Sequence, residues 1–335
     1  MDDIRGLPNL GNTCYLNSTL QLLRRCPRFV SVVVRGDGRK SAPMADALQN
    51  VYVSMSYLKV REFLRSIRRS FPRGFEICRQ NDVHEFLQLL LDRLNEETAT
   101  DARQDTRNRN SARNAVSMTN REHVSRGYTS LCDKMERNWN DAVMRRYSFV
   151  GSIFGTHLVS QIRCGLCKRT DHTGEIMSVI PLDMSSSSQT VSDGLAAFFS
   201  TEKVPEWRCD SCNRRTGGEK TYRIWRFPTT LLVMLKRFSN DGKKNNAEVC
   251  VNEDVDLEEY VVGPHSNCGC EYVLTAFICH FGRSAQSGHY VAFCRSSSSS
   301  SSWVCYDDDR VSIFGRDAVS RFSSNVYVMM YEKRT

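Results

Sequence analysis

The most regular pattern of hydrophobic and polar positions lies between residues 82 and 97. Its apolar side chains recur at the i, i+3, i+4 and i+7 spacing of a helix with one buried face, at Val83, Phe86, Leu87, Leu90, Leu91 and Leu94. Asp82 precedes them and is suited to cap the helix, with Glu85 as a box-like partner three residues later. The pattern predicts a helix over 82–97, in a front part that reads mostly helical.

Beyond about residue 147 the pattern changes to short runs rich in β-branched and aromatic residues, which are typical of strands. The runs that predict strands are 149–154, 157–163, 176–182, 222–227, 231–238, 272–279, 290–295 and 326–331. One short helix is expected among them, over 191–199. A helical front and a strand-rich back predict an α+β architecture with a cleft between the two parts.

Residues 98–127 separate these parts and show almost no periodicity. They are rich in Arg, Asn, Ser and Thr, which predicts a surface loop or a flexible insertion. The net charge of +8 is spread along the chain but gathers here, at Arg103, Arg107, Arg109, Arg113, Arg121 and Arg126. A solvated basic face or a disordered loop explains this excess better than a nucleic-acid site, so no nucleic-acid partner is expected.

With 40% hydrophobic and 25% charged residues, the composition is that of a soluble globular protein. The 335 residues can bury one large core or two modest ones. No run of about 18 apolar residues occurs, so no membrane span or membrane partner is expected, and the N-terminus lacks the apolar core of a signal peptide. We expect a cytoplasmic or nuclear protein whose 14 cysteines are free thiols and metal ligands rather than disulfides.

Cys14 stands where a loop is expected to become a helix. The segment 6–18 reads Gly-Leu-Pro-Asn-Leu-Gly-Asn-Thr-Cys-Tyr-Leu-Asn-Ser, with glycines before the cysteine and helical apolar spacing after it, at Leu16, Leu20 and Leu23. The unpaired N–H groups and the dipole of a helix start favour a thiolate, which is the nucleophile of cysteine hydrolases. The alternative is that Cys14 is a small buried apolar residue.

A second candidate group lies near the far end of the chain. Residues 287–294 and 303–311 read as two strands, with seven serines, 296–302, as the tip of a hairpin. His289 on the first strand and Asp307 at the end of the second can face each other. A thiolate, an imidazole and a carboxylate together make a nucleophilic triad. Asp308 and Asp309 compete with Asp307 for the third place, and spacing alone does not choose among them.

These blocks resemble the ubiquitin-specific proteases. The Cys14 segment looks like their cysteine box, and residues 288–290 and 303–311 look like their histidine box. Residues 80–87 resemble the family's Gln-x-Asp-x-x-Glu-Phe-Leu helix, and 235–238 its Leu-Lys-Arg-Phe strand, in the family's order. The resemblance implies one papain-like catalytic domain over 1–335, with a helical thumb, a β-rich palm and zinc-pinned β fingers. We expect a helical subdomain over about 1–146, with a flexible insertion near 98–146, and the strand-rich part over about 147–335.

The resemblance also implies catalytic roles. Cys14 is the nucleophile, and His289 is the general base and then the general acid toward the leaving amine. Asp307, the first acidic residue after Tyr306, orients the imidazole, and Asp308 is a secondary candidate for that role. Asn9 is expected to donate to the oxyanion, although an Asn after a proline is by itself more typical of a turn.

Four residues are expected at the substrate by the same resemblance. Gln80 and Asp82 would contact the C-terminal tail of ubiquitin, while the local pattern makes Asp82 a helix cap, and both roles can be filled by different oxygens. Gly288 would leave room for the Gly-Gly backbone of the modifier. Tyr290 would wall a narrow channel for it, or it is a tyrosine of the strand core.

Two Cys-x-x-Cys pairs predict a structural zinc. They are Cys164 with Cys167 and Cys209 with Cys212, and four thiolates suit a tetrahedral ion. Such an ion would pin the tips of long strands that have little core of their own. Cys268 and Cys270 form a weaker pair to which no metal is assigned.

The expected function is that of a thiol-dependent deubiquitinase acting on ubiquitin, or a ubiquitin-like modifier, in its protein conjugates. One alternative keeps the chemistry and changes the substrate to the interferon-induced ubiquitin-like modifier, which also ends in Gly-Gly. Another is a catalytically idle ubiquitin-binding scaffold, against which the presence of Cys14, His289 and Asp307 argues.

Overall fold

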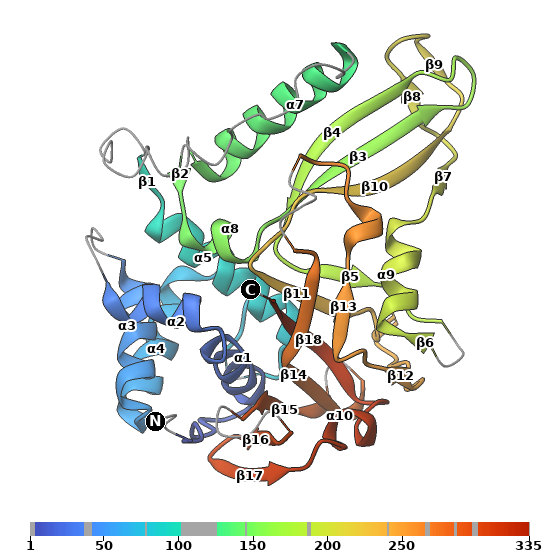
Figure 1. Ribbon diagram of the computed structural model, residues 1–335. Coiled ribbons are helices and arrows are strands. Elements are labelled where there is room, and N and C mark those ends of the chain that lie inside the picture. The colour runs from blue at the N-terminus through green and yellow to red at the C-terminus, as the bar shows by residue number, and fades with distance from the viewer. Residues whose placement is uncertain are drawn as a thin grey trace.

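The computed structural model describes residues 4–36, 42–77, 79–101, 126–144, 146–185, 189–239, 241–264, 269–284, 287–296 and 301–334. Helices dominate the front part of the chain, and α1 to α5 gather on the left of Figure 1, while α7 lies at the top beside β4. Their bounds are α1 (Cys14–Arg24), α2 (Pro27–Arg35), α3 (Pro43–Ser54), α4 (Tyr57–Ser70), α5 (Val83–Thr98), α7 (Arg126–Trp139), the π-helix η1 (Asn140–Met144) and α8 (Phe149–Phe154).

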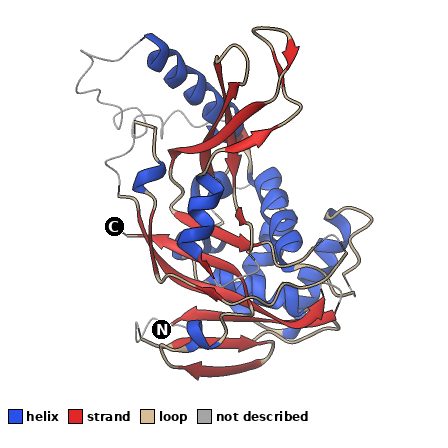
Figure 2. Ribbon diagram, turned by 90° about the vertical axis from the view of Figure 1, so that its right-hand side faces the viewer, coloured by secondary structure: helices blue, strands red, loops and turns tan. Residues whose placement is uncertain are grey.

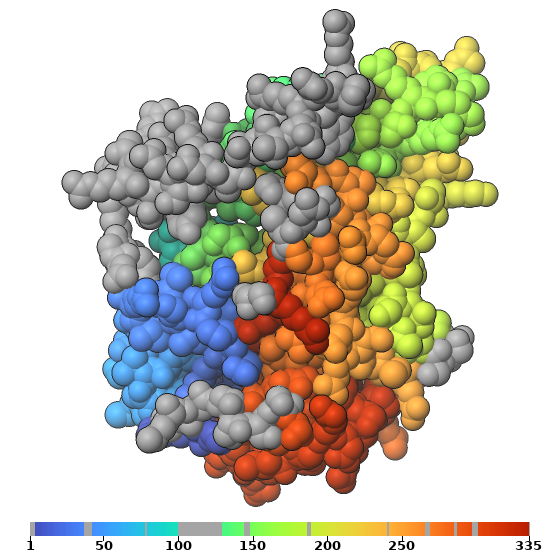
Figure 3. Space-filling view, in the orientation of Figure 1, coloured from blue at the N-terminus to red at the C-terminus, as the bar shows by residue number. Residues whose placement is uncertain are grey.

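The strands of the back part form a large mixed sheet, here called the palm sheet. Its order is β17 (Arg310–Phe314), β16 (Trp303–Asp307), β15 (Ser287–Arg295), β14 (Glu271–Ser284), β18 (Val326–Lys333), β11 (Thr230–Leu235) and β5 (Ile180–Leu182), with β13 (Asp254–Asp256) also on β14. The β11–β5 pair is parallel and the other pairs are antiparallel. The space-filling view in Figure 3 shows the blue helical part lying beside these orange and red strands.

A second sheet, here called the finger sheet, projects away from the palm sheet, as both ribbon views show (Figures 1 and 2). Its order is β4 (Thr170–Met177), β3 (Thr156–Cys164), β10 (Gly218–Arg226) and β7 (Glu202–Val204), and the small pair β8 (Arg208–Cys209) with β9 (Arg214–Arg215) lies at its tip. The remaining elements are β1 (Thr100–Asp101), β2 (Arg146–Tyr147), β6 (Gln189–Thr190), α9 (Val191–Phe199), β12 (Val249–Cys250), the 3-10 helix η2 (Glu258–Tyr260) and α10 (Ala318–Arg321).

Apart from its exposed edge strand β17, the palm sheet is buried on both faces. On one face, side chains such as Ile278 and Ala292 pack into the same core as Leu20 of α1 and Leu90 of α5. The other face packs with side chains of α9 and α10 in a separate core. Because a sheet covered on both sides needs apolar residues on both faces, its strands read as nearly continuous apolar runs.

The α+β fold class, with helical, palm and finger parts, is confirmed. The helix expected over 82–97 is α5, and the Asp82 side chain accepts hydrogen bonds from the backbone of His84 (2.8 Å) and Glu85 (3.1 Å) at its N-terminus. The helix over 191–199 is α9. The predicted hairpin is β15–β16, whose strands pair from Ala292 with Tyr306 to Arg295 with Trp303. Part of its serine tip, 297–300, lies outside the described residues.

Four expectations about elements need correction. Residues 149–154 form the helix α8 rather than a strand. Ser148 Oγ accepts the N–H of Val150 and caps the helix, and the buried side chains lie one turn apart on one face, at 149, 150, 153 and 154. The insertion contains the helix α7 and η1, while residues 102–125 lie outside the described part. The run 176–182 is interrupted between β4 and β5, and 231–238 leaves the sheet after Leu235.

Within the residues that the structure describes, no helix combines the length and the apolar character needed to cross a bilayer.

Candidate active site and metal centre

Cys14 is the first residue of α1, as the sequence predicts, and it is 4% exposed. The approach bends sharply, because Gly11 and Asn12 both have left-handed backbone angles, with φ of 97° and 54°. The following residue, Tyr15, is fully buried and packs edge-on against Phe86 of α5, with ring centroids 5.2 Å apart. The sulfur therefore lies at a helix N-terminus whose position is fixed by the packing of Tyr15 in the core.

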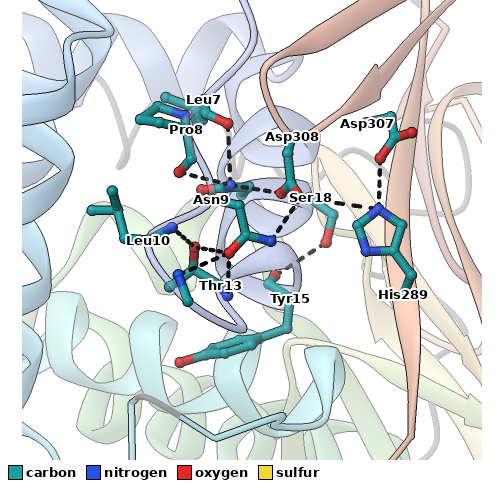
Figure 4. A network of polar contacts seen from close by, with 12 residues as sticks. Leu7, Pro8, Asn9, Leu10, Thr13, Tyr15, Ser18, His289, Asp307 and Asp308 are labelled. Carbon is teal, nitrogen blue, oxygen red and sulfur yellow. Dashed lines mark hydrogen bonds and ion pairs between the residues drawn. The ribbon is translucent and has the colours of Figure 1, made fainter.

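The β15–β16 hairpin brings His289 and Asp307 together. The Nε2 atom of His289 lies 2.5 Å from Oδ1 of Asp307 and 4.0 Å from Oδ2 of Asp308 (Figure 4). The hydrogen bond thus selects Asp307 among the neighbouring acids, which spacing in the sequence could not do. The bond also leaves Nδ1 of the ring for another partner, so the carboxylate fixes the orientation of the imidazole.

The side chain that acts most strongly on this imidazole is Cys14. Its hydrogen bond to the imidazole is the largest effect that raises the pKa of His289, to about 9. Partial burial opposes the shift, and the bond to Asp307 adds to it. The thiol at the start of α1 and the imidazole of β15 therefore lie close enough to interact, and α1 packs against β15.

Asp308 has a different environment from Asp307. Its two carboxylate oxygens accept hydrogen bonds from Nδ2 of Asn9 and Nδ2 of Asn17, both at 2.8 Å, and its carbonyl accepts from the N–H of Leu7 at 2.8 Å (Figure 4). Its backbone is left-handed, with φ of 54°. Asp308 thus ties the turn after β16 to the segment that leads into α1. Asn17 was not predicted as a site residue, although a polar side chain one turn after Cys14 on a buried helix indicates a polar partner.

Asn9 organises the loop before Cys14. Its Oδ1 accepts from the backbone N–H groups of Gly11 (3.0 Å) and Thr13 (3.2 Å), which is the turn role. Its Nδ2 donates one hydrogen to Asp308, and an amide of this kind has a second hydrogen to donate. Its oxyanion role stays a prediction.

The four residues expected at the substrate contact other parts of the protein. Gln80 Oε1 accepts from the N–H of Gly288 (2.9 Å), and Asp82 Oδ2 accepts from the hydroxyls of Tyr327 (2.8 Å) and Tyr290 (3.4 Å). Tyr290 is 3% exposed, which favours its reading as a tyrosine of the strand core. Contact of these residues with a modifier stays a prediction. Tyr327 was not anticipated, because its partner lies 245 positions away in the sequence.

Gly288 has a structural reason to be glycine. A Cβ there would lie 2.1 Å from Nε2 of His280 on β14, a side chain that is 1% exposed. Burial is the main cause that lowers the pKa of His280 to about 4, so the ring is neutral. The sequence suggested that Gly288 leaves space for substrate, and the structure adds that it leaves space for a buried imidazole.

The tip of the finger sheet gathers the four cysteines of the two pairs. Their sulfur atoms all lie within 4.8 Å of one another, with 3.9 Å between Cys164 and Cys212 and 3.7 Å between Cys167 and Cys209. A tetrahedral zinc with Zn–S bonds of about 2.3 Å requires sulfur atoms about 3.8 Å apart. The donor set and the spacing therefore fit a structural zinc ion.

The two turns that carry these cysteines have matching backbones. The residue after the second cysteine is left-handed in both, with φ of 61° at Lys168 and 55° at Asn213. Each turn thus curls its two thiols toward the same point. Cys270 is described and Cys268 is not, so the weaker pair lies partly outside the described residues.

Comparison with known proteins agrees with this site. The family model described as ubiquitin carboxyl-terminal hydrolase matches residues 5–331. A relative named probable ubiquitin carboxyl-terminal hydrolase 16, from Schizosaccharomyces pombe, is 28% identical over 100% of this chain and 68% of its own length. Ubiquitin carboxyl-terminal hydrolase 36 of Drosophila erecta is 28% identical over 98% of this chain, and ubiquitin carboxyl-terminal hydrolase 23 of Arabidopsis thaliana is 27% identical over 97%. The chain spans only 28% and 35% of those two relatives.

Solved structures show the same fold. The SAGA DUB module of Ubp8, Sgf11, Sus1 and Sgf73 bound to monoubiquitin contains a chain that matches with a TM-score of 0.73 and 19% identity, over 100% of this chain and 70% of that one. The same module bound to ubiquitin aldehyde matches with a TM-score of 0.72. A family model that spans nearly the whole chain, and a thiol, an imidazole and a carboxylate at one site, lead to one conclusion: the chain belongs to the ubiquitin carboxyl-terminal hydrolase family.

Proposed function

We propose that this chain is a thiol-dependent deubiquitinase that hydrolyses the isopeptide bond after the C-terminal Gly-Gly of ubiquitin. The observation that carries the proposal is the meeting of Cys14, from the helical part, with the His289–Asp307 pair, from the palm sheet. The family match and the names of the relatives support the reaction class. A neighbour of the same fold was solved with monoubiquitin, which supports ubiquitin as the substrate.

The proposed reaction uses these residues in turn. The Cys14 thiolate attacks the carbonyl carbon of the terminal glycine, and the tetrahedral oxyanion receives a hydrogen bond from the backbone N–H of Cys14 and one from the amide of Asn9. His289 holds the proton that it took from the thiol and passes it to the departing lysine amine. His289 then takes a proton from water, which attacks the acyl-enzyme and releases the modifier. Asp307 keeps the imidazole oriented through both steps.

The four cysteines of the finger tip would hold a structural zinc ion. Bound to Cys164, Cys167, Cys209 and Cys212, it would fix the two turns to each other and supply no reacting group. The reacting residues lie where α1 packs against β15 and the cysteines lie at the finger tip, so zinc would take part in the fold of the fingers and not in the hydrolysis.

Hydrolysis of a fluorogenic amide at the ubiquitin C-terminus tests the proposal. Wild-type protein should release the fluorophore, and Cys14→Ala should abolish release while it still binds ubiquitin. Cys250→Ala is the matched control, because Cys250 is an exposed free thiol of β12, and it should keep full activity. Cys14→Ala turnover near the wild-type rate would refute the nucleophile.

A panel of modifier probes tests the substrate. Ubiquitin and the interferon-induced ubiquitin-like modifier, each with the same C-terminal electrophile, are offered to the protein side by side. We expect faster labelling with ubiquitin, because the relatives and the structural neighbour are named for ubiquitin. Exclusive labelling with the other modifier would change the substrate and keep the chemistry, and binding of ubiquitin without any labelling would indicate an idle scaffold.

A further inference from the structure

We propose that Gln80 and Asp82 are positioning residues, which hold the strand segment around His289 from the start of α5. This inference rests on the proposed function of His289. Gly288 and Tyr290, the two neighbours of His289 in the strand, each bond to one of these residues. The imidazole is thereby fixed on both sides by a segment that lies outside its own sheet.

The first contact reaches the backbone just before His289. Gln80 Oε1 accepts the N–H of Gly288 at 2.9 Å. β16 pairs with β15 only from Ala292 onward, so the beginning of β15 is supported by β14 on one edge and lacks β16 on the other. The side-chain amide of Gln80 thus supplies an acceptor at a part of the strand that its neighbour does not cover.

The second contact reaches the side chain just after His289. Asp82 uses one oxygen to cap α5 and the other to accept from the hydroxyls of Tyr290 and Tyr327. Burial, followed by the Asp82 carboxylate, raises the pKa of the Tyr290 hydroxyl well above its usual range. Both tyrosines therefore stay protonated and donate to the start of α5.

The segment that carries these contacts is itself fixed. Asn81 Nδ2 donates to the carbonyls of Glu76 and Arg79, both at 3.0 Å, which braces the loop before α5. α5 in turn carries Phe86, which packs against Tyr15, the neighbour of Cys14. One helix thus sets the place of the nucleophile through its buried face and the place of the base through its N-terminus.

A contact with the substrate tail would give these residues a different signature. A residue that binds only the tail changes KM and leaves the free enzyme's thiol reactivity as it is. A positioning residue changes that reactivity even when no modifier is present. Alkylation of Cys14 by iodoacetamide separates the two, because this reagent is too small to use a tail-binding site.

The test compares Gln80→Ala, Gln80→Glu and Arg79→Ala by the rate of Cys14 alkylation across a pH series. Gln80→Glu keeps an acceptor for the Gly288 N–H, and Arg79 is an exposed neighbour on the same loop. Loss of one hydrogen bond should slow alkylation of Gln80→Ala about fivefold near neutral pH, with the profile moved to higher pH and kcat lowered more than KM is raised. Gln80→Glu should recover most of the rate, and Arg79→Ala should match wild type.

An alkylation profile of Gln80→Ala that coincides with the wild type, together with a raised KM, would overturn the positioning role in favour of tail contact. Tyr327→Phe is a second test, because it removes the palm-sheet hydroxyl that donates to Asp82. It should shift the alkylation profile in the same direction. The alkylation measurement needs no modifier, so a failure of the proposed deubiquitinase activity would leave the alkylation profiles readable on their own.

Discussion

Gly288→Ala is the perturbation for which the surroundings of His289 give the sharpest expectation. A Cβ at this position would lie 2.1 Å from Nε2 and 2.5 Å from Cε1 of His280, and 2.8 Å from the carbonyl oxygen of Phe281. Non-bonded heavy atoms pack at about 3.5 Å. The strand, the ring or both must therefore move by about 1 Å to admit one methyl group.

The ring has little room to give. His280 is 1% exposed, and its centroid lies 4.7 Å from that of Tyr290 and 5.2 Å from that of Phe238. Overpacking of this kind costs about 1–3 kcal/mol of unfolding free energy. Since the displaced residue is adjacent to His289, a shift of about 1 Å should also lower kcat by about 100-fold.

Thermal unfolding and steady-state hydrolysis of a ubiquitin C-terminal amide check both numbers. The double variant Gly288→Ala with His280→Ala removes the obstructing ring. Its loss of unfolding free energy should be smaller, by about 1–3 kcal/mol, than the sum of the losses in the two single variants. Its loss of activity should likewise be smaller than the two single losses combined. If Gly288 were needed only to admit the Gly-Gly tail, Gly288→Ala would keep the wild-type stability and the second substitution would rescue nothing. That result would refute the packing argument.

Three further outcomes are expected. Because folding raises the pKa of His289 from 6.5 to about 9, its contribution to stability is complete below 6.5 and is lost as the pH rises toward about 9, and Cys14→Ala should flatten this slope in pH-dependent thermal unfolding. Cys209→Ser or a strong chelator should remove zinc from the protein, as elemental analysis would show, and lower Tm. Ser148→Ala should lower the unfolding free energy in urea by about 1 kcal/mol through loss of the α8 cap.

The fold could be predicted from the sequence wherever periodicity was strong. α5 follows from apolar spacing and from the cap at Asp82, and the short helix expected over 191–199 is α9, which Thr190 caps in the structure. α8 was mistaken for a strand because six residues rich in Phe, Val and Ile fit either conformation, and its cap and tertiary contacts decide the outcome. α7 was not predicted, because it lies in the insertion that was expected to be flexible. It packs on the finger sheet through contacts such as that of Asn138 with Gly174, 36 positions away.

The site could be predicted as a set of residue types, and only partly as an arrangement. Cys14 and His289 were singled out by their segments, but no local pattern says which of the adjacent acids the imidazole meets. The hairpin register places Asp307 at 2.5 Å, while Asp308 is held by Asn9 and Asn17. The two contacts of Asp308 join positions about 300 residues apart, and such pairings are set by tertiary packing.

The most direct measurement is peptide-level mass spectrometry of the protein after reaction with ubiquitin that carries a C-terminal electrophile. The account predicts a single adduct on the peptide that contains Cys14, and its loss when His289 is replaced by alanine. Stable modification at another cysteine, or equal labelling of Cys14 without His289, would contradict the claim that these two side chains act as one reacting pair.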